Sequence, residues 1–114
     1  MAYSEFQADR IRTRLTGIPF VEKKMMGGLI FMVNDAMCVG LDIEKTTRKD
    51  RLMVRVGKLN YEDLLNRNGS RPMDFTGSHM NGFLFVNLSG FDNEYDLDFW
   101  IAKALEFNQY LIKK

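Results

Sequence analysis

The sequence predicts an α+β domain of order αββββαββα, in which an antiparallel sheet of five to six strands is covered by the N- and C-terminal helices. Helical periodicity is confined to the two ends of the chain and to one short segment between them. The remaining runs are short, alternating or apolar, and tight turns separate several of them, as in antiparallel sheets. Strands and helices do not alternate regularly, which disfavours a doubly wound parallel sheet.

The first helix is expected to begin at Ser4, because Ser4 and Gln7 fit a capping box. Gly17 and Pro19 end it. One face of this helix is apolar and consists of Ala8, Ile11 and Leu15.

Four strands follow, with tight turns expected at Gly27-Gly28 and Asn34-Asp35. The first run alternates apolar and charged residues, as a half-buried strand does. The third is apolar on both faces, which is typical of a central strand. These strands are expected over residues 20–26, 29–33, 36–41 and 52–56.

The second half of the chain is expected to add two strands and end in a long helix. Its elements are a short helix over 61–66, a strand over 73–76, a loop over 77–82, a strand over 83–88 and a helix from Asn93 or Asp96 to about Leu111. Asn108 falls inside the apolar arc of the last helix, so it needs a hydrogen-bond partner if it is buried.

Length and composition indicate a single domain over residues 1–114. A chain of this size buries about two-thirds of its unfolded surface, so it can fold without metal or disulfides. The single cysteine excludes an internal disulfide and fits a reducing compartment. The N-terminus has no apolar core like that of a signal peptide, and no apolar run approaches the ~18 residues of a membrane span. We therefore expect a cytoplasmic protein without a membrane segment.

Little in the sequence points to catalysis. Cys38 lies in an apolar strand, so we expect it to be packed in the core, and a Cys38–His79 pair is the chemical alternative. A transition-metal site needs several histidine or cysteine ligands, and the chain has one of each. We therefore expect no enzyme, no catalytic residue, no metal and no cofactor. Asp74 either stands on the rim of a pocket or pairs with Arg71 or Arg55.

A nucleic-acid-binding surface is the alternative to a protein-binding one. The net charge is only +1, but residues 1–60 carry 11 Lys/Arg and 7 Asp/Glu, whereas residues 61–114 carry 5 and 8. A basic loop and the first helix account for most of the excess. The residues that would contact phosphates are Arg10, Arg14, Lys45, Arg48, Lys49 and Arg51.

Two groups of apolar residues could lie either in the core or on a binding surface. Phe99 and Tyr110 fall on the polar side of the last helix, by chance or as a contact for a partner or a second copy. Seven methionines besides Met1 lie mostly at strand positions, where they fill the core or form an adaptable binding surface.

Five motifs, in this order and spacing, resemble the N-terminal domain of the TfoX/Sxy family. They are KKMMGGLIFMVNDAMCVG (23–40), RLMVRVG (51–57), RPMDFTG (71–77), MNGFLFV (80–86) and DLDFWIAKALEFN (96–108). The departures are Met26, where the family usually has Phe, and Ser78-His79, where it tends to have Arg-Pro.

The resemblance implies a fold like that of secretion chaperones, which often form dimers. It implies a non-enzymatic regulator of natural competence, with a partner in the transcription machinery or another regulator. Full-length competence regulators carry a second, helical domain, so we expect this chain to be a stand-alone N-terminal-type domain and an adaptor. The residues we expect to contact a partner are Phe99, Tyr110, Arg71, Asp74 and Thr76.

Overall fold

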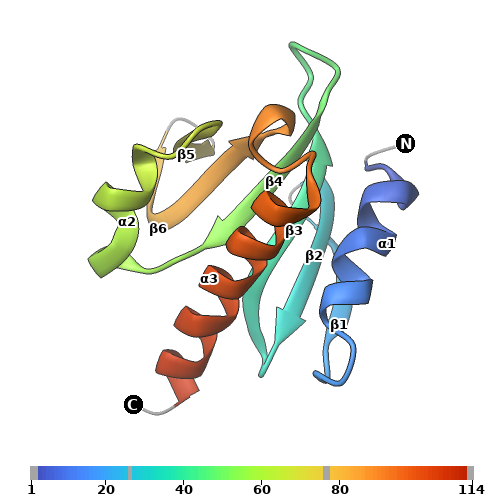
Figure 1. Ribbon diagram of the computed structural model, residues 1–114, viewed down its shortest axis with the longest axis vertical. Helices are drawn as coiled ribbons and strands as arrows, with labels where there is room; N and C mark the ends of the chain where they lie inside the picture. The colour runs from blue at the N-terminus through green and yellow to red at the C-terminus, as the bar shows by residue number, and fades with distance from the viewer. Residues whose placement is uncertain (1–2, 26, 76–77, 113–114) are drawn as a thin grey trace.

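The computed structural model has three helices on one face of an antiparallel sheet (Figure 1). It describes residues 3–25, 27–75 and 78–112, and it describes the side chains of these residues except 74, 75 and 78–81. The strands follow the spatial order β1-β2-β3-β4-β6-β5, and every neighbouring pair is antiparallel. The elements are α1 (Glu5–Arg14), β1 (Val21–Met25), β2 (Gly28–Val33), β3 (Ala36–Ile43), β4 (Asp50–Arg55), α2 (Lys58–Leu65), β5 (Ser70–Phe75), β6 (Ser78–Asn87), a 3-10 turn η1 (Leu88–Gly90) and α3 (Glu94–Ile112).

The main core lies between the sheet and the helices. Helix α3 crosses the sheet, with α1 on one side of it and α2 on the other (Figure 1). Trp100 is fully buried at the centre, and its indole N–H donates to the Gly90 carbonyl oxygen at 3.1 Å. The predicted α+β class, the order of elements and the cover of N- and C-terminal helices are confirmed. Helix α2 adds Leu64 to the same core.

The opposite face of the sheet holds a smaller apolar cluster. Met53 and Met73 are buried there, so these two methionines fill the core. Arg51 lies over the Phe85 ring at 3.8 Å, so an arginine stem and head cover the cluster. Five buried residues form it: Ile30, Met53, Met73, Phe83 and Phe85. Met26 and the side chain of Met80 lie outside the described residues.

The predicted hairpin turn at Asn34-Asp35 and the predicted partner for Asn108 are both present. Asn34 and Asp35 adopt φ of 54° and 63°, which a tight two-residue turn requires. Asn108 is buried, donates to the Val33 carbonyl oxygen at 2.9 Å and accepts from the Asn34 amide at 2.8 Å. Helix α3 is therefore hydrogen-bonded to the β2–β3 turn.

Two predictions near the N-terminus need correction. Ser4 Oγ accepts from the Gln7 backbone N–H, but the Gln7 side chain donates to Asp50 at 3.2 Å and does not return to Ser4. The expected half-buried strand over 20–26 is an exposed edge. Val21 of β1 is 58% exposed, and the strand pairs on one side only, so no neighbour covers its apolar residues.

Other boundaries shift because pairing overrides local propensity. The segment 77–82, predicted as a loop, is part of β6 from Ser78 onward, where it pairs with β5; residue 77 lies outside the described residues. Gly28, expected in the turn, instead begins β2 and pairs with Met25. Helix α2 starts at Lys58 rather than at residue 61, because Gly57 takes a φ of +83° at its N-cap. No helix in the described ranges is long and apolar enough to cross a membrane.

Candidate functional site: a groove between α2 and α3

A groove of about 540 Å³ opens where the start of α2 meets the C-terminal half of α3. Pockets that bind ligands typically have volumes of roughly 300–1,000 Å³. We call this the α2–α3 groove. It is lined by residues 55–60 of the β4–α2 segment, by Gly82 of β6, and by Glu106, Phe107, Tyr110 and Leu111 of α3.

Two glycines form the floor of the α2–α3 groove. Gly57 and Gly82 have φ of +83° and +86°, which residues with a Cβ rarely adopt. The backbone N–H groups of Val56 and Gly57 both donate to the Gly82 carbonyl oxygen, at 2.8 and 3.0 Å. A Cβ at Gly57 would overlap the ring of Phe107. The ring therefore lies directly on the backbone because residue 57 has no side chain.

Aromatic and aliphatic side chains form the walls. The rings of Phe107 and Tyr110 stack with centroids 6.0 Å apart and an interplanar angle of 27°. Tyr110 is 49% exposed, and Leu59 on the first turn of α2 is 88% exposed. Large apolar side chains at this exposure, gathered around one groove, are typical of a contact surface.

Two cations, Arg55 and Lys58, line the groove. The guanidinium carbon of Arg55 lies 5.1 Å from the Phe83 ring centroid and 5.5 Å from that of Phe107. Within the described part of the chain, no carboxylate lies within 4.0 Å of Arg55. Lys58 is exposed beside it. Among the described residues, Arg55 is thus positioned by aromatic rings and not by an ion pair.

A second, polar cleft of about 480 Å³ lies near the β3–β4 connection and contains Arg71 and Lys49. Arg71 donates to Glu44 at 3.1 Å. Burial pushes the pKa of Glu44 upward, but the hydrogen bond and charge of Arg71, with help from Thr47 and Arg51, leave that pKa below its ordinary value. Glu44 stays ionised and neutralises Arg71, so Arg71 contributes little free positive charge to this cleft.

The structure separates the two aromatic residues that we expected to form one surface. Phe99 is half-buried: its ring packs edge-on against Trp100 at 5.4 Å, and the Arg67 guanidinium covers it at 3.5 Å. Tyr110 lies eleven positions after Phe99, or about 16 Å along the helix at ~1.5 Å per residue. Only Tyr110 lines the α2–α3 groove. Partner contact by Phe99 stays a prediction.

Several predicted site residues lie outside what the structure describes. The backbone of Asp74 pairs with that of His79 in the β5–β6 ladder, but neither side chain is described. Thr76 lies outside the described residues altogether. Their roles, like that of Arg71 at an interface, stay predictions.

Cys38 is packed in the core as expected. Its side chain is 1% exposed. Burial raises the pKa of its thiol to about 12, although the charge of Arg55 acts in the opposite direction. At neutral pH Cys38 is therefore a protonated thiol that reagents cannot reach, which opposes the Cys38–His79 alternative.

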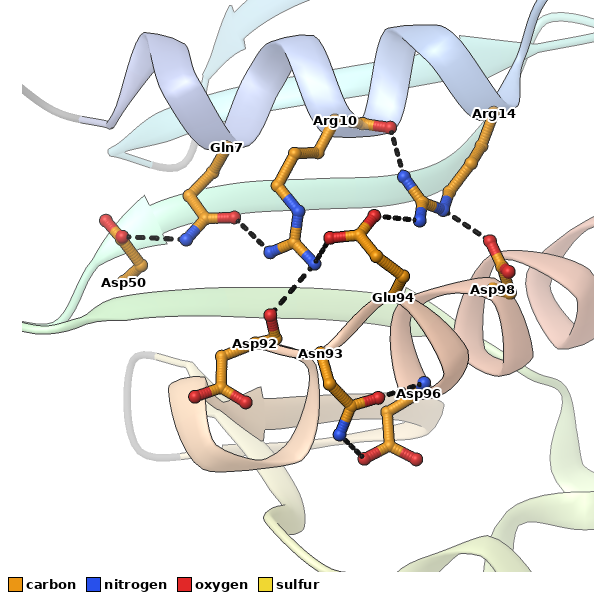
Figure 2. Close-up of polar contacts among 9 residues, drawn as sticks. All are labelled: Gln7, Arg10, Arg14, Asp50, Asp92, Asn93, Glu94, Asp96 and Asp98. Carbon is orange, nitrogen blue, oxygen red and sulfur yellow. Dashed lines mark hydrogen bonds and ion pairs between the residues drawn. The ribbon is translucent and has the colours of Figure 1, made fainter.

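Half of the predicted nucleic-acid surface is occupied by internal ion pairs. Arg10 and Arg14 point from α1 toward the start of α3 (Figure 2). Arg10 donates to Glu94 at 2.9 Å and to the Asp92 carbonyl oxygen at 3.1 Å. Arg14 donates to Glu94 and, at 2.6 Å, to Asp98.

The remaining basic residues divide in the same way. Arg51 binds both carboxylate oxygens of Asp42, at 3.0 and 2.7 Å. Lys45, Arg48 and Lys49 are exposed, and no carboxylate of the described residues lies within 4.0 Å of them. The basic loop is therefore the part of this predicted surface that remains available.

Sequence reasoning missed the main features of the groove. The sequence predicts for Arg55 only a candidate pairing with Asp74, and it singles out neither Gly57 nor Phe107 as a site residue. One local signal was present: Gly57 precedes a helix whose first turn has no acidic residue and whose N-cap makes no side-chain hydrogen bond. Among the described residues, no group of three or more His, Cys, Asp or Glu could hold a metal ion.

Comparisons with known proteins identify a family and a fold. The model of the family described as the TfoX N-terminal domain matches residues 16–108. A crystal structure of a protein from Pseudomonas syringae superposes with a TM-score of 0.61 at 18% identity, covering 86% of this chain and 94% of that one. At this identity the likeness shows the fold alone. No curated protein matches the chain.

Proposed function

Because the chain belongs to the TfoX N-terminal domain family, we propose that it is a non-enzymatic regulatory module that binds a protein partner in the α2–α3 groove. One observation carries the choice of this site. The groove combines a stacked aromatic pair with the exposed Leu59, whereas Cys38 is sealed in the core. Amphipathic aromatic residues and exposed leucines at a concave site are features of protein contacts.

The TfoX/Sxy resemblance supports a more specific version of the proposal. In this version the partner belongs to the transcription machinery or is another regulator, and the process is natural competence or the control of transcription. The protein acts in the cytoplasm and forms a homodimer, as the chaperone-like fold suggests. Of the residues expected from the sequence to contact a partner, Tyr110 lines the proposed site.

The test is site-specific photo-cross-linking in the native host. A photoreactive amino acid replaces Leu59, inside the groove, or Tyr95, which is 76% exposed on the first turn of α3 and does not line it. We expect a discrete protein adduct from position 59 and none of the same mass from position 95. Leu59→Ser with Tyr110→Ser should abolish capture of that partner, while Tyr95→Ser should leave it unchanged.

If the two positions gave equal adducts, or if the groove variants captured the partner as well as wild type does, the groove would not be the interface. Capture that nuclease treatment removes would instead favour the second candidate function.

That second candidate is nucleic-acid binding through the basic loop, because Lys45, Arg48 and Lys49 are exposed without carboxylate partners among the described residues. Three phosphate contacts give a plot of log K against log salt with a slope of about −2.7. The triple change of these residues to Gln should abolish binding of a random-sequence duplex. No binding of that duplex at low salt excludes this candidate.

A further inference from the structure

We propose that the α2–α3 groove selects a protein segment in which a carboxylate stands next to an apolar side chain, and that Arg55 binds the carboxylate. This inference rests on the proposed function, because it specifies the chemistry of the partner at the same site. Three features of the groove support it: an arginine with no carboxylate of the described residues within 4.0 Å, a surplus of positive charge, and an apolar wall.

Arg55 differs from most arginines of this protein. The chain has eight arginines, and six of them lie within 4.0 Å of a carboxylate of the described residues. Of the other two, Arg48 stands on the exposed loop, and Arg55 lies in the groove between the rings of Phe83 and Phe107. A guanidinium has five N–H donors and no acceptor, and no acceptor side chain of the described residues takes those of Arg55, so they can serve water or an acid from outside.

The charges of the groove are complementary to an acid. Its cations are Arg55 and Lys58, and its one carboxylate, Glu106, lies 3.5 Å from Lys103 outside the groove. The backbone adds to this surplus, since residues 58–60 begin α2 and carry N–H groups without partners inside the helix. A carboxylate bound at Arg55 in this groove therefore lies in a site with a second cation, Lys58, and the positive end of a helix.

The apolar wall specifies what stands next to the acid. Phe107 and Tyr110 present stacked rings along one side, and Leu59 and Leu111 extend the apolar surface. A large aliphatic or aromatic side chain placed there would bury apolar area that is now exposed to water. A peptide that alternates acidic and apolar residues can contact both the cations and the apolar wall. A nucleic-acid backbone offers phosphates but no such apolar side chains.

The test is a selection from a display library of short random peptides on the full chain. We expect enriched peptides to carry Asp or Glu next to Leu, Phe or Trp. A representative peptide should bind Arg55→Gln about tenfold or more weakly than wild type, as expected for loss of a charge-assisted hydrogen bond. Arg48→Gln removes the other arginine that has no carboxylate partner among the described residues; it lies outside the groove, so the variant should bind like wild type.

A second measurement avoids any effect of Arg55→Gln on folding. The acid of the selected peptide is replaced by its amide, and binding to wild-type protein should weaken by a similar factor. Amide chemical shifts of Gly57, Lys58 and Leu59 should move on titration with the acidic peptide and much less with the amide peptide.

The outcomes separate this inference from the proposed function. The inference is overturned if the enriched peptides are apolar and lack acids, or if acidic peptides bind Arg55→Gln as well as wild type. If the binding of such peptides still depends on Tyr110, the proposal that the groove binds a protein segment still holds. No enrichment, or shifts that map away from residues 55–60 and α3, overturns both.

Discussion

Gly57 carries two constraints at once, a positive φ and contact with the Phe107 ring. Gly57→Ala should lower the free energy of unfolding by about 1–3 kcal/mol from backbone strain, with a further loss as the ring is displaced. Gly17 has a φ of +86° with nothing within 4 Å of an added Cβ, so Gly17→Ala reports the strain alone. Urea unfolding of both variants measures the difference, and equal losses would contradict a packing role for Gly57.

Cys38 gives the protein a dependence on alkaline pH. Burial raises the pKa of its thiol from 9.0 to about 12, so the folded state holds the proton more tightly than the unfolded state. The stability from this group is complete below about pH 9 and is lost as the pH rises toward 12. Wild type should therefore lose more stability than Cys38→Ala between these pH values, as measured by urea unfolding. Parallel losses in the two proteins would refute a buried, protonated thiol.

Among the elements, α1 is held to α3 by charge as well as by its apolar face (Figure 2). Arg14→Gln should reduce the hydrogen-exchange protection of α1, and the effect should shrink with added salt. Lys103→Gln removes a pair within α3 and is the control, since it should leave α1 unchanged.

Lowering the pH should weaken the same contact between α1 and α3. Hydrogen bonds from Arg14, with the charges of Arg10 and Arg14, hold the pKa of Glu94 below its ordinary value. Glu94 therefore stabilises the α1–α3 contact at pH values above the ordinary carboxyl pKa. This stabilisation is lost as the pH falls through the lowered pKa of Glu94. If the hydrogen-exchange protection of α1 changed neither with acid, nor with salt, nor in Arg14→Gln, the ion pairs would contribute nothing to holding α1 on α3.

The order and type of the elements could be predicted, but their edges could not. Asn34-Asp35 specified its turn because the two residues tolerate the positive φ that the turn needs. Ser78 to Gly82 has a turn-like composition, yet it forms strand because β5 supplies a pairing partner. Pairing is a long-range effect that no local pattern contains.

The groove shows the same limit more strongly. Arg55 and Phe107 lie 52 positions apart in the sequence and meet only because α3 crosses the end of β4. Asn108 could be identified as needing a partner, but Val33 and Asn34 could not be named as that partner. The sequence indicates which side chains need contacts, while the topology decides which contacts they make.

For the whole molecule, the sheet order creates one pairing unlike the others. Strand β4 pairs with β6 and not with β5, so α2 and β5 lie between the two partners in the chain. The closest pair across this junction, Arg55 and Phe83, is separated by 28 residues. The other neighbouring strands are consecutive in sequence. Closing the β4–β6 junction therefore costs the most chain entropy.

This cost predicts which contacts limit folding. Val86→Ala in β6 lies at the junction, and Val33→Ala lies beside the β2–β3 turn; both valines are buried. We expect Val86→Ala chiefly to slow refolding and Val33→Ala chiefly to speed unfolding, as stopped-flow measurements in urea would show. The reverse partition would mean that the junction closes after the rate-limiting step.

The β4–β6 pairing also has a consequence for the chain as it leaves the ribosome. Synthesis proceeds from the N-terminus, so β1 to β4 emerge while β6 is still unmade. During that interval β4 has a partner on one side only, and its Leu52 and Val54 have neither β6 nor α3 to cover them. An unpaired apolar edge is a site for aggregation. The nascent protein is thus most vulnerable from the release of β4 until residue 87 has followed it.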